Sequence, residues 1–181
     1  IVTMTYPLIG NYGVNAEDVE HAHPWAEGFV VRELSRVRSN HRATEDLDAY
    51  LRRHRIPGIT GIDTRALTRR LRERGALRGV LSGVDLDDAS LVRKARAVPA
   101  MEGRDLVPQV TCAAVQRWTE FLRGDPFVAS AQNRTFAHRV ACLDYGLKFN
   151  ILRCLIDAGC DATVFPAQTK GDDILAFKPD G

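Results

Sequence analysis

Cysteine is scarce in this chain, and its placement argues against two common kinds of site. The 181 residues include four cysteines, at positions 112, 142, 154 and 160, and no CxxC pair. Without paired cysteines the sequence offers neither a typical zinc site nor a disulfide framework. Cys142, Cys154 and Cys160 lie among apolar residues, where cysteine commonly serves as a small buried side chain of a cytosolic protein. None lies beside a histidine in a recognisable local motif, so we predict no catalytic cysteine here.

Long hydrophobic runs are missing as well. No stretch approaches the ~20 consecutive apolar residues that cross a bilayer. Hydrophobic residues nevertheless make up 45% of the chain, enough for a packed core, and charged residues make up 27%, as in ordinary soluble proteins. We therefore predict a cytoplasmic protein of one large domain or two small ones. Because the sequence begins at Ile1 instead of methionine, we interpret it as a processed or cropped piece.

Arginines are concentrated between residues 32 and 78. This stretch has thirteen arginines and six acidic groups, a net charge of +7, whereas the whole chain totals +2. Tyr50 is its one aromatic residue, so it lacks a stacking platform for single-stranded nucleic acid. We expect solvated arginines and contacts with a partner. A basic nucleic-acid-binding module, or a non-catalytic subunit-contact module, is the alternative interpretation.

The clearest local pattern is a capped helix with a cationic outer face. Asp63 or Thr64 can cap its first turn, and Gly75 suits the left-handed position after its last turn. Leu67 and Leu71 lie four residues apart, on one face. The other faces carry five arginines, at positions 65, 69, 70, 72 and 74. The pattern predicts one buried side and one strongly basic side.

Strands and helices alternate along the chain, which predicts an α/β fold. In the first part we expect strands at 1–6, 28–34 and 78–82, a helix at 45–56 capped by Thr44, a helix at 85–97, and an extended edge segment at 107–111. In the second part we expect strands at 139–143 and 161–166, helices at 149–158 and 172–177, and a turn at 144–146. The order β-α-β-α requires parallel strands joined by a crossover helix. Within the helix at 149–158 we expect Ile151, Leu152, Leu155 and Ile156 to face inward.

Three histidines, His21, His23 and His54, are possible ligands. His21 and His23 could share one face of a strand and bind a metal, but no third ligand is near them in the sequence. We therefore favour a surface or packing role for both and predict no metal site. His54 is expected at the end of a helix.

Four sequence blocks carry a recognisable pattern: residues 1–13, Ser39–Leu47, Gly61–Arg69 and Asp144–Arg153. In this order and spacing they closely resemble the small, glutamine-hydrolysing subunit of carbamoyl-phosphate synthase. The resemblance covers nearly the whole chain and is weakest between about residues 84 and 138. It implies an N-terminal mixed α/β domain, of the swivelling β/β/α kind, at 1–120 without its first strands. A linker at 121–137 and an incomplete, flavodoxin-like class I glutamine amidotransferase domain at 138–181 would follow.

The resemblance also implies a chemistry. In that family a cysteine, assisted by a histidine and a glutamate, hydrolyses glutamine. The ammonia passes to a large subunit, which uses ATP and bicarbonate to make carbamoyl phosphate for the arginine and pyrimidine pathways. The implied partners are the large subunit and glutamine, with no nucleic acid and no membrane. We expect no cofactor in this chain, and ATP and magnesium on the large subunit.

Lys148 is the single candidate site residue. The family's catalytic residues match no position of this sequence, so the chain alone is expected to be inactive. Lys148 matches a lysine that the family places near the glutaminase site, and it follows the first parallel strand of the second part, where ligands gather in open α/β sheets. It could orient glutamine or couple the site to the partner. It could equally be a loop lysine that pairs with nearby carboxylates.

Overall fold

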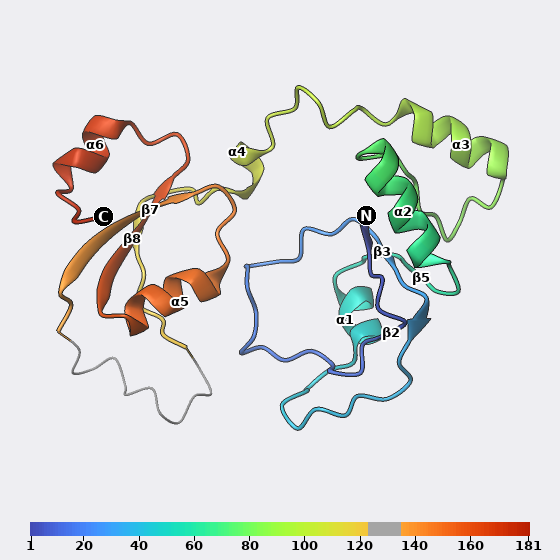
Figure 1. Cartoon of the computed structure of the whole chain (residues 1–181), viewed down its shortest axis with the longest axis horizontal. Helices are drawn as coiled ribbons and strands as arrows, with labels where there is room; N and C mark the ends of the chain where they lie inside the picture. The colour runs from blue at the N-terminus through green and yellow to red at the C-terminus, as the bar shows by residue number, and fades with distance from the viewer. Residues whose placement is uncertain (123–134) are drawn as a thin grey trace. The chain divides into compact units, whose positions relative to one another are not determined.

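The computed structural model describes residues 1–122 and 135–181 (Figure 1). The chain divides into two compact units, one of residues 1–18 with 23–104 and one of 19–22 with 105–181. Each unit contains parallel strands and helices, so the predicted α/β class is confirmed. Most of the predicted linker at 121–137 lies outside the described residues, and the predicted domain boundaries stay a prediction.

Short parallel strands form the sheets of the first unit. β1 (Val2–Thr3), β3 (Phe29–Val30) and β5 (Gly58–Ile59) pair in the order β1-β3-β5, and β2 (Leu8–Ile9) pairs with β4 (Glu33–Leu34). The predicted strand at 28–34 is therefore split between two partners. The N–H of Val31 donates to Ile59, whereas the N–H of Glu33 donates to Pro7. No strand forms at 78–82, where the Arg78 side chain donates to the carbonyls of Arg96 and Val98.

Aspartates cap the three helices of the first unit. These are α1 (Leu47–Arg53), α2 (Thr64–Arg74) and α3 (Asp88–Ala97), capped by Asp46, Asp63 and Asp87. The prediction of Thr44 as the first cap is wrong, because Thr44 pairs with Val14 through both its N–H and its hydroxyl. The predicted Asp63 cap is confirmed, with the Ala66 N–H 2.9 Å from its carboxylate. Gly75 ends α2 with φ of +79°, as predicted.

A three-stranded sheet forms the centre of the second unit. β7 (His138–Asp144) and β8 (Cys160–Pro166) pair in parallel over seven residues, joined by α5 (Phe149–Asp157) and followed by α6 (Gly171–Ala176). The predicted β-α-β-α order is confirmed. β6 (Gln116–Arg117) adds an antiparallel edge beside β8, in the order β6-β8-β7. This two-residue strand is not predicted from the sequence.

One helical turn replaces the extended segment predicted at 107–111. It is α4 (Val107–Val110), closed by the N–H of Thr111 on the carbonyl of Val107 at 3.1 Å. Proline fits the first turn of a helix because an N–H there has no partner within the helix. Pro108 therefore permits this turn, although it also argued against a central strand.

The core of the second unit centres on β8, against which α5 packs (Figure 1). Its most deeply buried apolar side chains are Leu152, Ile156, Ala162, Val164 and Phe165. The prediction that Ile151 faces inward is wrong, because this side chain is 49% exposed. On the same helix Arg153 is buried instead, with 6% exposure. Within the described residues no helix is both long and apolar enough to cross a membrane.

Candidate functional site

Lys148 is the residue directly before α5, and it follows the carboxyl end of β7. Its backbone is extended, with φ of −77° and ψ of 132°, and its side chain makes no capping hydrogen bond. The side chain is 67% exposed, and Nζ lies 3.8 Å from Oε1 of Glu20. An exposed ion pair of this length is weak. The structure thus presents the ammonium group at the strand end where ligands of parallel sheets bind, and its role stays a prediction.

Glu20 caps α5 from a distant part of the chain. Its carbonyl accepts from the N–H of Phe149 at 3.0 Å, and its carboxylate accepts from the N–H of Asn150 at 2.9 Å. These first-turn N–H groups have no partners inside the helix, and a negative charge is favourable at this end. Glu20 therefore supplies the cap that Lys148 does not.

Arg153, one turn further along α5, binds the segment that contains Glu20. Its Nη1 donates to the carbonyl of Val19 at 3.0 Å, and its Nη2 lies 3.2 Å from the carboxylate of Glu120. The guanidinium also lies 5.7 Å from the ring centre of Phe149. A buried charge needs such partners to offset its lost hydration. Residues 19–22 are consequently bound to the N-terminal half of α5, beside Lys148.

Asp144 organises the turn that leads from β7 to Lys148. One carboxylate oxygen accepts from the N–H groups of Gly146 and Leu147, at 2.9 and 2.8 Å, and the other accepts from the N–H of Cys112 at 2.7 Å. The residue is 8% exposed. Gly146 has φ of +99°, a conformation that favours glycine. The turn is thus closed by a single buried side chain.

The two cysteines with shifted acidity are not activated thiols. Burial raises the pKa of Cys142, and repulsion from Cys160 raises it further. Burial is also the main cause of the raised pKa of Cys112, with the negative charge of Asp144 adding to it. Because the thiolate is the nucleophilic form, a raised pKa lowers reactivity at neutral pH.

The histidines have aromatic neighbours. His21 stacks on Phe149 with ring centres 5.7 Å apart, and the ring centres of His23 and Trp25 are 4.0 Å apart. His54 follows the last residue of α1, as predicted. In the part of the chain that the structure describes, no three His, Cys, Asp or Glu side chains gather as a metal site would require.

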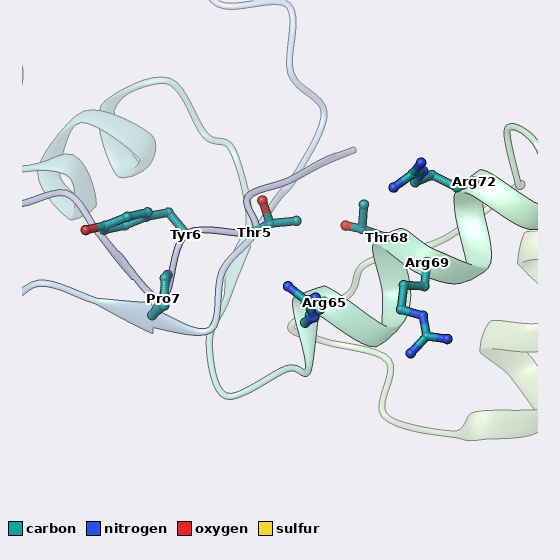
Figure 2. A pocket seen from close by; sticks show the side chains of 7 residues that line it. All are labelled: Thr5, Tyr6, Pro7, Arg65, Thr68, Arg69 and Arg72. Carbon is teal, nitrogen blue, oxygen red and sulfur yellow. The ribbon is translucent and has the colours of Figure 1, made fainter.

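A second candidate site lies in the first unit, on the basic face of α2 (Figure 2). It is an open hollow of about 400 Å³, here called the arginine hollow. Its lining residues are Thr5, Tyr6, Pro7, Arg65, Thr68, Arg69 and Arg72. Three of the five arginines that the sequence placed on this helix therefore face one concave surface. The sequence predicted the basic face of α2 but not the N-terminal segment opposite it.

Removing the cap carboxylate should loosen the start of α5. In Glu20→Ala the N–H of Asn150 loses its acceptor, so we expect a loss of about 1 kcal/mol, as for other helix caps, and faster amide exchange at Asn150. Hydrogen exchange read by NMR measures this. Glu102→Ala, at an exposed glutamate of the other unit, is the control. Unchanged exchange at Asn150 in the Glu20 variant would contradict the capping role.

Among known proteins, this chain is similar to carbamoyl-phosphate synthase small chains. Residues 1–81 match the family model described as carbamoyl-phosphate synthase small chain, CPSase domain. The chain is 50% identical over 185 residues to the carbamoyl phosphate synthase small chain of Syntrophotalea carbinolica and 48% identical over 185 residues to that of Escherichia coli K12. It is 47% identical over 186 residues to that of Salmonella typhimurium. Each match covers 100% of this chain and 48% of the relative. The chain thus spans about half the length of the curated relatives it matches.

Proposed function

This chain is related along its whole length to the carbamoyl-phosphate synthase small chains, and on that basis we propose that it forms part of a glutamine-dependent carbamoyl-phosphate synthase. The observation that carries the proposal is 50% identity over an alignment that includes the entire chain. In this proposal the small subunit hydrolyses glutamine and supplies ammonia to a large subunit. The large subunit, with ATP and magnesium, then makes carbamoyl phosphate for the arginine and pyrimidine pathways in the cytoplasm.

Lys148 would act on the glutamine side of this reaction. Its ammonium group is mostly exposed and lies at the carboxyl end of a parallel strand. An ammonium in this position can bind the α-carboxylate of glutamine by a charge-assisted hydrogen bond. The Asp144 turn fixes the backbone on one side of it, and the Glu20 cap fixes the helix on the other. These contacts fix the backbone from which the exposed Lys148 side chain extends.

The basic helix α2 would have no catalytic role. Thr64 at its start is 1% exposed, and Leu67 and Leu71 are half-buried, so its inner face stabilises the first unit. Its arginines face outward, where a partner subunit could meet them. We propose that this helix is part of the scaffold or, through the arginines at positions 70 and 74, of the contact with the large subunit.

Residues 1–181 alone should not hydrolyse glutamine. No catalytic cysteine, histidine or glutamate of the family matches a position of this sequence, and Cys112 and Cys142 have raised pKa values. We expect no release of glutamate above background when purified chain is incubated with glutamine. A coupled glutamate dehydrogenase assay measures this, with a full-length bacterial small chain assayed in parallel. Glutamine turnover that follows the chain through two different purification steps would contradict the prediction.

A further inference from the structure

The arginine hollow combines cations and hydroxyl groups on facing segments. Arg65, Thr68, Arg69 and Arg72 have the spacing i, i+3, i+4, i+7, which brings them to one face of α2. Figure 2 shows Thr68 directed toward Thr5 on the N-terminal segment, with Arg65 and Arg72 on either side of Thr68 along the helix. The hollow therefore offers guanidinium and hydroxyl donors from two directions.

Within the described residues, the charges of the hollow have no carboxylate partner. None of its seven lining residues is acidic. Among the described residues, no ion pair joins Arg65, Arg69 or Arg72 to a carboxylate. On α1, by contrast, Arg52 and Arg53 pair with carboxylates at 2.8 and 2.7 Å. Like charges one turn apart on a helix repel each other, so a bound anion would relieve the repulsion in the hollow.

The shape of the hollow suits a small ligand. Its volume of about 400 Å³ is within the range of sites that hold small molecules. Guanidinium groups bind phosphate oxygens through two parallel N–H bonds, and threonine hydroxyls can donate further bonds.

We propose that the arginine hollow is a binding site for the diphosphate group of a small molecule, either free pyrophosphate or a nucleoside diphosphate. Arg65 and Arg72 bind the phosphate oxygens, and the hydroxyl groups of Thr5 and Thr68 complete the contacts. This site lies within the first unit and is independent of glutamine hydrolysis. It could therefore exist whether or not the proposed function is correct.

Titration calorimetry with pyrophosphate at low salt tests the site in the whole chain. We expect saturable binding that Arg65→Gln/Arg72→Gln weakens at least about tenfold, which corresponds to about 1.4 kcal/mol. The control, Arg70→Gln/Arg74→Gln, removes the same charge from the same helix outside the hollow and should change the affinity less than about threefold. Circular dichroism melts of both variants establish that they are folded. Absence of binding at millimolar pyrophosphate, or equal weakening in the two variants, overturns the proposal.

Two further titrations identify the source of the phosphate. ADP that binds tighter than pyrophosphate supports a nucleoside diphosphate as the ligand. Equal affinity for ADP and pyrophosphate supports recognition of the diphosphate alone, and adenosine should not bind in either case. A single-stranded oligonucleotide is titrated as well. If it binds, if pyrophosphate does not compete with it, and if both double variants weaken its binding equally, the surface is one that binds nucleic acid and the proposal is overturned.

Discussion

Asp144→Ala is expected to destabilise the second unit by about 3 kcal/mol or more. Asp144 is 8% exposed in the wild type, and its carboxylate accepts three backbone N–H bonds, from Gly146, Leu147 and Cys112. Hydrogen bonds to a charged group are each worth about 1.5–3 kcal/mol, and a donor left buried without a partner adds a penalty. Alanine removes both acceptor oxygens and with them all three bonds, so the turn and the attachment of residue 112 are both weakened.

Urea unfolding followed by tryptophan fluorescence measures this effect. The chain has two tryptophans, Trp25 in the first unit and Trp118 in the second, so a Trp25→Phe background reports on the second unit alone. Asp144→Asn should fall between wild type and alanine, because its amide keeps one acceptor oxygen. Asp172→Ala, at an exposed aspartate in the first turn of α6, should cost at most about 1 kcal/mol. An Asp144→Ala protein as stable as this control would contradict the proposed role of the turn.

Lys148→Met is expected to lower glutamine-dependent synthesis of carbamoyl phosphate by about tenfold or more, and to leave ammonia-dependent synthesis unchanged. Methionine keeps an unbranched side chain one atom shorter than lysine and removes the charge, and one charge-assisted hydrogen bond is worth about 1.5–3 kcal/mol. The test requires a full-length small chain that contains this sequence, assembled with the large subunit. A raised KM for glutamine would indicate substrate orientation, whereas a lower rate at unchanged KM would indicate coupling to the partner.

Lys170→Met is the matched control for this experiment. Lys170 directly precedes α6 as Lys148 precedes α5, follows the neighbouring strand β8, and likewise makes no capping hydrogen bond. It is exposed. We expect both activities of the Lys170 variant to match wild type. If Lys148→Met lost glutamine-dependent and ammonia-dependent synthesis equally, a folding defect would explain the result and the proposed role would be wrong.

The sequence predicted best where apolar runs are long. β7, α5 and β8 were found within one or two residues because each combines a hydrophobic pattern with a turn or glycine at its end. The face of α5 was harder to predict. An apolar pattern favours burial of Ile151 over Arg153, but Arg153 is buried because Val19 and Glu120 provide acceptors from elsewhere in the chain.

Other errors arose where local signals were ambiguous. Thr44 and Asp46 are both good helix caps, and only the pairing of Thr44 with Val14 decides between them. β6 is two residues long and exists through its pairing with β8, which propensity alone does not reveal. Pro108 fits an edge segment as well as the first turn of a helix, so its presence could not distinguish them.

The candidate site was only partly visible in the sequence. Lys148 was identified through the resemblance, but Glu20 gave no local signal because it lies 130 residues from Asn150 in the chain. A missing cap was the available clue, since the residue before α5 is a lysine and not a good helix cap. The arginine hollow was predicted only in part. The sequence showed the basic face of α2, but the segment opposite it, residues 5–7, lies far from α2 in the chain.

The transfer of nitrogen from glutamine tests the central claim most directly. A full-length small chain containing this sequence would be assembled with the large subunit and given ATP, bicarbonate, amide-¹⁵N glutamine and unlabelled ammonium. The account predicts that carbamoyl phosphate carries ¹⁵N, because ammonia released from glutamine reaches the large subunit directly. Carbamoyl phosphate without label, formed at the rate that ammonium alone supports, would contradict it.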